Sequence, residues 1–446
     1  MRNLSFRPIA PALLALLAFT PSLPADELSQ LRDQLHALER QLLVLERKQE
    51  IQDERVTVTD RGYTVTSADG ANALRLRGLV QLDSRLFFND GGLANNAFVL
   101  RRARIIAEGT FAKNFSFQIV PEFGGSSPVI VDANLGVTVS PALQFKLGRF
   151  KSPVGLELLQ SDSWTFFDER SIVTNLVPNR DLGIQASGDI LNGTVNYTVG
   201  IFGGVADGAS TTNSDFDNEK DVVARLLATP FRQKLGSPLQ GLSFGVSGSY
   251  GREKTTAGRT GGYRTDGQQT FFSYLATTIT DGPNWRVSPQ LDYRHGSFGL
   301  LSEYVVSTVN VRASATGQLT ELRNKAWQVS VGYVLTGENS SSNGVVPGTD
   351  FNLSKGTWGA FEVAGRYADL KVDDAAFPLY ASPAASAAEA SSFGLGLNWY
   401  LSKAVRFTFD YYQTKFDRAP GVPATLTNAV IRQDEKSLIT RFQVSF

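Results

Sequence analysis

Two kinds of side chain alternate along LRLRGLVQLDSRLFF (residues 74–88). Apolar residues fall at most even positions, and the charged residues fall between them at Arg75, Arg77, Asp83 and Arg85. A period of two is that of a β-strand, whose successive side chains point to opposite faces. One face of this predicted strand is therefore apolar and the other is charged.

The same alternation recurs along the rest of the chain. We predict about 16 strands, the number typical of porins, at residues 74–88, 97–109, 115–123, 129–139, 143–150, 182–190, 194–206, 220–229, 242–253, 285–295, 298–312, 322–335, 357–371, 390–401, 405–417 and 432–446. Charged residues fill one face of many strands, so that face meets water while the apolar face meets lipid. The sequence predicts an all-β transmembrane protein, a 16-stranded antiparallel outer-membrane β-barrel over residues 74–446.

The predicted connections alternate in length, as expected of short periplasmic turns and long outer loops. Those after even-numbered strands are mostly short, as at 112–114, whereas those after odd-numbered strands are longer. The connection 151–181 is the longest candidate for a loop folded into the barrel. Two segments disturb the pattern: 336–356 is a long connection on the periplasmic side, and 270–279 reads equally well as a strand.

The N-terminal residues 1–25 have the layout of a secretory signal peptide. Arg2 and Arg7 precede the apolar run 9–19, and Ala25 follows as a small residue suited to cleavage. A membrane anchor is the alternative, but the run has about half the roughly 20 residues that a spanning helix needs. We expect export, and residence in the outer membrane of a Gram-negative-type bacterium.

A short coiled coil is predicted next, over residues 26–51. Leucine recurs at spacings of three and four, at positions 28, 31, 35, 38, 42 and 45. This seam requires partner helices, and we expect self-association in the periplasm. The alternative is an amphipathic helix packed on its own domain, but the neighbouring sequence offers no helical domain to pack on. Residues 52–73 are expected to form a linker.

Composition excludes several classes of function. The chain has 446 residues, with 43 Lys and Arg against 43 Asp and Glu, so it lacks the basic excess of a nucleic-acid-binding protein. It has no cysteine and only two histidines, His36 and His295. Thiolate and multi-histidine metal sites are therefore excluded, and we expect no cofactor.

The last predicted strand carries a second signal. Leu438, Phe442 and the terminal Phe446 lie on one face, opposite Arg441 and Gln443. A chain that ends in phenylalanine on an alternating strand resembles the terminal signature of outer-membrane barrels. This resemblance implies recognition by the barrel assembly machinery.

Three further stretches resemble the phosphate-selective porin O and P family. They are FVLRRARIIAEGTF (98–111), LQFKLGRFKSPVGLELLQSDSWTFFDER (143–170) with VPNRDLGIQ (177–185), and GTWGAFEVAGRYADL (356–370) with LGLNWYLSKAVRFTFDY (395–411). The resemblance implies a homotrimer of 16-stranded barrels, with long loops folded into each pore and a basic constriction that passes phosphate or other small anions.

Candidate constriction residues come from the resemblance and from position. Arg101 and Arg102 match the family's paired arginines, with Arg104 close by, although adjacent residues on a regular strand face opposite sides. Either a bulge turns both inward or Arg101 lies at the rim. Arg149 and Lys151 stand at the root of the long loop. Guanidinium groups match phosphate oxygens, and a narrow, poorly hydrated opening strengthens each charge.

Alternation also places charged residues on the inner wall. The basic ones are Arg75, Arg77, Arg85, Lys146, Arg286 and Arg294, and the acidic ones include Asp83 and Asp132. Many of these charges are expected to form cross-strand ion pairs, so the wall alone does not indicate anion selectivity.

Two rival functions remain. A general or sugar-conducting trimeric porin would use the same barrel, with aromatic side chains such as Trp164, Phe166 and Phe167 on the inner wall. An outer-membrane enzyme would need a constellation of catalytic side chains. His295, in a predicted periplasmic turn, is a poor catalytic partner, so we expect a channel and no enzyme.

Overall fold

The computed structural model describes residues 25–53, 55–59, 62–88, 94–211, 218–255, 261–422 and 434–446. The predicted signal peptide, apart from Ala25, lies outside these residues.

One closed antiparallel barrel dominates the described part of the chain. Its sheet has 18 strands, of which β1 and β2 lie outside the ring, and the other 16 close it. The ring consists of β3 (Ala73–Phe88), β4 (Ala97–Phe111), β5 (Phe115–Glu122), β6 (Val129–Ser140), β7 (Leu143–Lys151), β8 (Arg180–Ile190), β9 (Val195–Phe202), β10 (Asp221–Ala228), β11 (Leu242–Lys254), β14 (Ile279–His295), β15 (Phe298–Arg312), β16 (Thr320–Val334), β17 (Ala360–Lys371), β18 (Glu389–Tyr400), β19 (Val405–Asp417) and β20 (Glu435–Ser445). The last strand pairs with the first.

The 16-stranded barrel predicted from the sequence is confirmed, with most strand ends close to the expected residues. β14 differs most, because it begins at Ile279, ahead of a register shift between Thr280 and Trp285. The doubtful segment 270–279 does not add a strand to the ring. Part of it forms β13 (Thr270–Ser273), which pairs with β12 (Gly262–Arg264) in a separate two-stranded sheet. The even number of barrel strands is thereby preserved.

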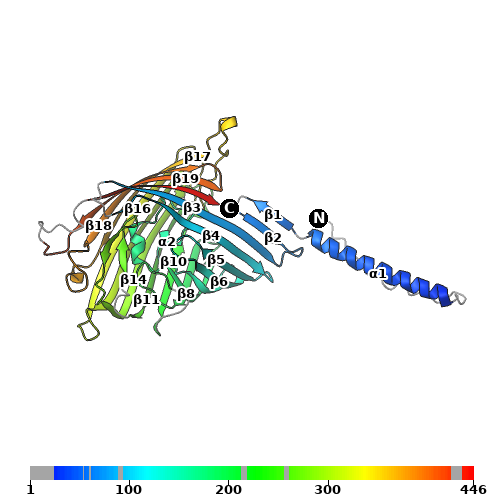
Figure 1. The fold of residues 1–446 in the computed structure, drawn as a ribbon, viewed down its shortest axis with the longest axis horizontal. Coiled ribbons are helices and arrows are strands. Elements are labelled where there is room, and N and C mark those ends of the chain that lie inside the picture. The colour runs from blue at the N-terminus through cyan, green and yellow to red at the C-terminus, as the bar shows by residue number, and fades with distance from the viewer. Residues whose placement is uncertain are drawn as a thin grey trace.

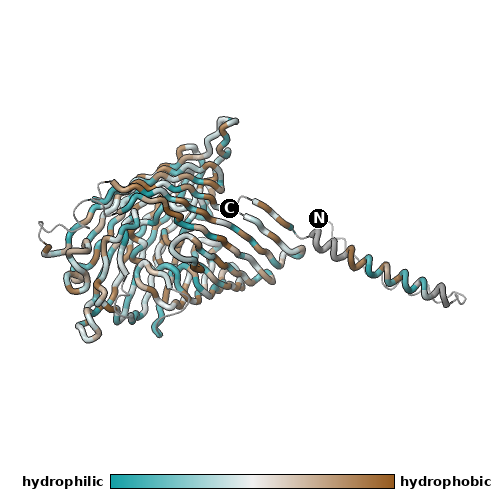
Figure 2. Tube along the Cα trace, in the orientation of Figure 1, coloured by the Kyte–Doolittle hydropathy of each residue, from teal (hydrophilic) through white to brown (hydrophobic). Residues whose placement is uncertain are grey.

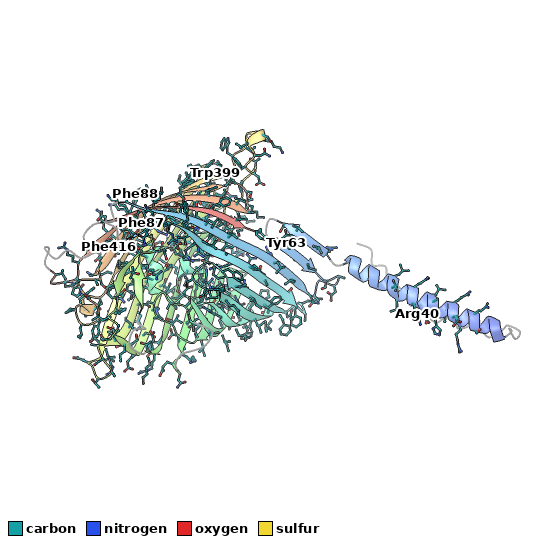
Figure 3. All side chains as sticks on the ribbon, viewed as in Figure 1. Arg40, Tyr63, Phe87, Phe88, Trp399 and Phe416 are labelled. Atoms are coloured by element: carbon teal, nitrogen blue, oxygen red, sulfur yellow. The ribbon has the colours of Figure 1, made fainter. Side chains whose placement is uncertain are left out.

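The two faces of the wall differ as the alternation predicts. Along β18, Phe393, Leu395 and Leu397 point outward and are exposed, whereas the residues between them are buried. Figure 2 shows apolar and polar segments alternating along the strands. In Figure 3, Phe87, Phe88 and Phe416 lie toward the end of the barrel away from the N-terminal helix. A lipid-facing exterior therefore surrounds a polar interior.

The two ends of the barrel carry different connections. At the end near the helix, tight turns such as 112–114 and 296–297 join the strands, and the turns 229–241 and 335–359 are longer. Long loops lie at the opposite end, the longest being 152–179 between β7 and β8. Lys151 and Arg180 belong to these strands, so the loop is slightly shorter than the predicted 151–181. Short turns mark the periplasmic end of such barrels.

The N-terminal segment leaves the barrel at this periplasmic end (Figure 1). Helix α1 (Ala25–Asp53) covers the predicted coiled coil, and Leu35, Leu38, Leu42 and Leu45 are exposed on it. The expected linker contains two short strands, β1 (Arg55–Thr59) and β2 (Gly62–Thr66), which pair with each other. Alternating valine and threonine explain these strands, and β2 adds to the first residues of β3. Among the described helices, none has the length and apolarity required to cross a bilayer.

Candidate pore constriction

The loop 152–179 folds into the barrel and is fastened to one side of its wall. Polar side chains of β17 to β20 donate hydrogen bonds to its backbone carbonyl groups. The donors are Gln443 to Ser163 (3.1 Å), Arg406 to Thr165 (2.9 Å), Asn398 to Phe166 (2.8 Å), Arg366 to Glu169 (3.0 Å) and Arg441 to Asp168. Several inward-facing charges of the wall thus hold the loop and do not face open lumen.

The aromatic residues of the loop take part in this attachment. Phe166 and Phe167 are 7% and 0% exposed. The guanidinium groups of Arg294 and Arg366 lie 4.4 Å from the ring centroids of Phe166 and Phe167, respectively. Such cation–π contacts gain strength away from water. These two rings pack on the wall instead of lining a sugar-conducting path.

The opposite side of the lumen, along β3 to β10, contains two cavities. The outer cavity, of about 450 Å³, lies among the long loops and is lined by Arg101, Asn175 and Arg264, among others. The inner cavity, of about 390 Å³, faces the periplasmic half and is lined by residues that include Arg77 and Lys146. Three residues line both cavities: Arg104, Asp162 and Arg180. The boundary between the cavities, where these residues lie, is the candidate constriction.

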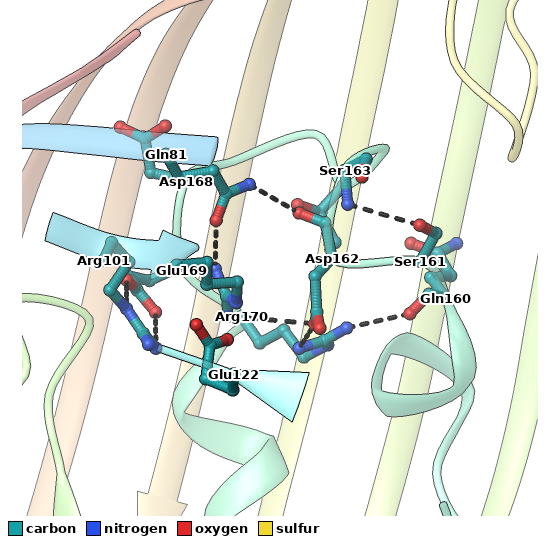
Figure 4. Close-up of polar contacts among 12 residues, drawn as sticks. Gln81, Arg101, Glu122, Gln160, Ser161, Asp162, Ser163, Asp168, Glu169 and Arg170 are labelled. Carbon is teal, nitrogen blue, oxygen red and sulfur yellow. Dashed lines mark hydrogen bonds and ion pairs between the residues drawn. The ribbon is translucent and has the colours of Figure 1, made fainter. Parts of the chain in front are cut away.

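Asp162 is the centre of this constriction. Its buried carboxylate contacts the guanidinium groups of Arg104 from β4 and Arg170 from the loop itself. Arg102 and Arg180 lie 3.8 Å from it and the Lys151 ammonium lies 4.0 Å away. Figure 4 shows Arg170 reaching Asp162 from the same loop. We call Arg102, Arg104, Lys151, Arg170 and Arg180 the basic ring.

The charges of the constriction do not cancel. Besides Asp162, Glu122 lies 2.6 Å from Arg104 and Asp132 lies 3.1 Å from Arg180. Five formal positive charges thus face three carboxylates. Burial opposes ionisation of Asp162, but the surrounding cations, Arg170 first among them, hold its pKa well below its usual value. The carboxylate therefore stays ionised, and the side chains around it carry a formal excess of positive charge.

A β-bulge explains how two adjacent arginines reach the same cavity. Gln81 of β3 pairs with Arg102 of β4, whereas the next residue, Leu82, pairs with Leu100. Arg101 is the extra residue, and both it and Arg102 line the outer cavity. The bulge was one of the two alternatives left open by the sequence. Arg101 also binds Glu169, at 2.6 and 3.0 Å (Figure 4).

Lys151 is the last residue of β7 and reaches the constriction from the end of that strand. Gly148 on β7 has a φ of 122°, a value that glycine adopts without strain. Beyond it, the adjacent residues Phe150 and Lys151 both line the inner cavity. The Lys151 ammonium also donates a hydrogen bond of 2.8 Å to the carbonyl group of Gln160 in the loop.

The remaining basic candidates divide between the lumen and other positions. Lys146 and Arg77 line the inner cavity, and Arg75 and Arg77 both approach Glu108, at 3.6 and 2.8 Å. Arg85 lies between Asp83 and Glu169, at 3.0 and 3.3 Å. The contacts with Glu108 join β3 to β4 and are cross-strand ion pairs of the kind expected from the sequence. The contacts of Arg85 lie within β3 and with the inward loop.

Six candidates line neither cavity of the constriction: Arg75 and Arg85, described above, and four others. Arg149 donates to the carbonyl group of Ile130 at 2.6 Å. Arg286 is buried against Asp207 at 2.6 Å, and Arg294 packs on Phe166. Asp83 is buried and binds Arg441 at 2.6 Å. Arg149 points away because regular alternation places it on the outward face of β7, with the exposed Phe145 and Leu147. Arg286 and Arg294 are held against loop residues, and Asp83 is held against Arg441. Of the expected acidic residues, Asp132 does line the inner cavity.

Three central residues were not singled out from the sequence: Asp162, Arg170 and Arg180. Arg170 and Arg180 lie in the stretches DER and PNR that support the family resemblance. Arg170 lies within the long loop and Arg180 directly follows it, at the start of β8. Their placement on either side of the second half of the loop could have indicated both residues. Asp162 had no such signal, because a single loop carboxylate gives no pattern.

The closed barrel, its polar lumen and its loop-narrowed passage define a water-filled channel of the outer membrane, a porin. The chain belongs to the phosphate-selective porin O and P family, whose model matches residues 74–446. It is 25% identical to Porin O of Pseudomonas aeruginosa over 416 residues, which cover 85% of this chain and 90% of that protein. The family and the fold point to a channel rather than an enzyme.

Solved structures of outer-membrane proteins share the fold. The outer membrane channel DcaP of Acinetobacter baumannii has a TM-score of 0.55 at 12% identity, covering 85% of this chain and 99% of that one. OmpT of Vibrio cholerae, in its trimer form, has a TM-score of 0.52 at 11% identity, covering 84% of this chain and 100% of that one. Both are outer-membrane proteins.

Proposed function

We propose that this porin is an anion-selective channel for phosphate or related anions, with the basic ring around Asp162 as its selectivity filter. One observation carries the proposal: five cations converge on a single buried carboxylate where the two cavities meet. An anion that passes this point loses part of its hydration, and the ring replaces it with charge-assisted hydrogen bonds, each worth about 1.5–3 kcal/mol.

Asp162 acts in this scheme as an internal counter-ion. It occupies the ring when no solute is present, and an arriving anion shares the same donors with it. Conduction requires that the solute leave as well as bind. A resident carboxylate weakens the hold of five cations on the passing anion, and so favours release.

The general or sugar-conducting porin is supported less well. Such a channel would present aromatic rings along its path, but Phe166 and Phe167 are buried against the wall. Trp164 packs with the buried cluster of Val334, Val345 and Tyr400. Arginine side chains, in contrast, line both cavities, and Lys146 and Lys151 line the inner one.

The assembly we propose is a homotrimer in the outer membrane, with the α1 helices associating in the periplasm. The exposed leucine seam of α1 supports association, and the trimer form of the OmpT relative supports the number. We also propose that the barrel assembly machinery recognises β20. The terminal Phe446 closes the ring there, since its backbone exchanges hydrogen bonds of 2.7 and 3.0 Å with Gly78.

Titration of phosphate into chloride tests the proposed filter. We expect phosphate to block chloride current through the trimer in planar bilayers, because both anions use the basic ring and phosphate forms more hydrogen bonds there. Replacing Arg104 by Gln should raise the half-blocking concentration by about tenfold, equivalent to about 1.4 kcal/mol. A chloride current that phosphate leaves unchanged would contradict the proposal.

A further inference from the structure

The turn 335–359 between β16 and β17 folds over the periplasmic rim of the barrel. Its inner limb enters the lumen, where Ser340 and Val345 are 8% and 2% exposed. Gly344, with a φ of 87°, lies directly against the Trp164 ring of the inward loop, so that a larger side chain would collide with it. The long connection expected at 336–356 is thus part of the wall.

The outer limb of the same turn, residues 351–358, lies on the outside of the barrel. Its rings rest on Trp399 of β18: the ring centroid of Phe351 is 5.3 Å away and that of Trp358 is 6.3 Å away. The Trp399 indole N–H donates a hydrogen bond of 2.6 Å to the carbonyl group of Trp358. Figure 1 shows this segment as the yellow projection beside β17, and Figure 3 labels Trp399 below it.

The outer limb extends a row of rings on the lipid-facing surface. Phe361, Trp399, Phe407 and Phe442 are direct neighbours in register on β17 to β20. Their successive centroid distances are 5.7, 6.4 and 4.8 Å. The row lies near the periplasmic strand ends, where aromatic residues mark the boundary between hydrocarbon and headgroups. The outer limb therefore begins where the membrane-facing belt ends.

The exposed side chains of the outer limb suit that boundary. Leu353 and Trp358 are 72% and 54% exposed, and Lys355 is exposed between them in the short helix η3 (Leu353–Lys355). Leucine is favoured in the acyl region, indole rings in the headgroup region, and lysine ammonium groups beside lipid phosphates. Contact with water does not stabilise the exposed apolar side chains of Leu353 and Trp358.

We propose that the outer limb 351–358 docks on the periplasmic leaflet of the outer membrane and binds a phospholipid there. Leu353 and Trp358 enter the boundary between acyl chains and headgroups, and Lys355 lies beside the headgroup phosphate. Continuity with the aromatic belt identifies lipid as the occupant. The limb extends membrane contact beyond the strands themselves, on the same turn whose inner limb touches the pore loop.

A second long turn at this rim, 229–241, also contacts an outward-facing aromatic residue. The carbonyl group of Pro238 accepts a hydrogen bond of 2.8 Å from Tyr293, which lies on the outward face of β14. Leu235, at its tip, is 86% exposed and follows Lys234. Two of the long periplasmic turns thus present a leucine and a lysine next to an outward aromatic residue.

Single spin labels measure the proposed depth directly, because the chain has no cysteine of its own. The variant Leu353→Cys is labelled and the whole protein is placed in phosphatidylcholine vesicles with and without phosphatidylglycerol. Collisions with oxygen, which concentrates in lipid, are compared with those of a water-soluble nickel chelate. Leu395→Cys provides the reference for the hydrocarbon region, and His36→Cys on α1 provides the reference for water.

The measured quantity is the ratio of oxygen collisions to nickel-chelate collisions. We expect this ratio for the Leu353→Cys label to lie between the ratios for Leu395→Cys and His36→Cys. The added substitution Lys355→Glu should shift the label toward water, and more so in vesicles that contain phosphatidylglycerol. A label as open to nickel as that of His36→Cys would overturn the proposal, since the limb would lie in water. A label shielded from both reagents would also overturn it, because a protein surface, such as a second copy of this chain, would then cover the limb.

Discussion

Arg104 on the barrel wall and Asp162 in the inward loop are in direct contact, although 58 residues separate them in the chain. The contact lies where the outer and inner cavities meet, and four further cations surround the same carboxylate. This one contact therefore ties the loop to β4 and also belongs to the proposed anion filter.

Removing the charge of Asp162 should tighten anion binding. In Asp162→Asn the five cations keep their positions but lose the resident carboxylate, so a passing anion no longer shares its donors. We expect the half-blocking concentration of phosphate to fall by about tenfold, or about 1.4 kcal/mol, and anion release to slow. Single-channel recordings with a phosphate titration check both effects. Glu321→Gln, an exposed carboxylate on β16, is the matched control and should change neither.

Reversing charges within the basic ring should reverse the ion preference. Arg102→Glu with Lys151→Glu turns two positive charges into negative ones within about 4 Å of Asp162. The reversal potential should move toward cation preference, and phosphate block should disappear. Lys371→Glu makes the same kind of change at an exposed site outside the lumen and should have no such effect. If the doubly substituted channel remained equally anion-selective, the proposed function would stand, but the basic ring would not be its selectivity filter.

Arg441 is expected to matter for stability and for loop position. It is fully buried and contacts Asp83 at 2.6 Å, Glu169 at 2.9 Å and the Asp168 carbonyl group. In Arg441→Met those carboxylates lose a buried partner, a change that typically costs about 3–5 kcal/mol. We expect a lower unfolding temperature together with larger and noisier single-channel conductance. An unchanged conductance would show that the loop stays in place without this residue.

Ionisation of Asp168 should make the stability of the folded protein depend on pH. Burial, followed by the nearby Asp410 carboxylate, raises the pKa of Asp168 well above its ordinary 3.8. A group with a raised pKa stabilises the fold fully below its ordinary pKa, and this contribution is lost as the pH rises through the raised value. Asp168→Asn should therefore stabilise the protein at neutral pH by about 1 kcal/mol.

The same difference should shrink toward zero as the pH falls below about 4. Thermal unfolding of both proteins across the pH range measures it. A stabilisation that is equal at all pH values would show that ionisation of Asp168 is not the cause.

The leucine seam of α1 should contribute to trimer association. Leu35 and Leu38 are 50% and 61% exposed in the single chain, and burying each in a helix bundle is worth about 1.5–3 kcal/mol. Leu35→Asp with Leu38→Asp should weaken the trimer on native gels while the barrel stays folded. Gln41→Asp, off the seam, serves as the control. Trimers that survive the double substitution unaltered would mean that barrel contacts hold the assembly.

The strands could be predicted closely because a lipid-facing wall imposes a strict alternation on the sequence. The pairing of Arg101 and Arg102 in one cavity was predictable only as an alternative, since a bulge leaves no mark in composition. The meeting of Asp162, Arg170 and Arg180 depends on the path of a folded loop, which periodicity does not describe. For the same reason Arg286 and Asp83 were expected in the lumen, whereas loops and ion pairs enclose them.

The reversal potential of the wild-type protein in a potassium chloride gradient is a direct measure of its anion selectivity. It requires no substitution and no knowledge of the natural solute. The basic ring predicts a potential close to the equilibrium potential of chloride, because the positive excess around Asp162 favours anions over potassium. A potential near zero, or one of the opposite sign, would contradict the account and would favour a general porin.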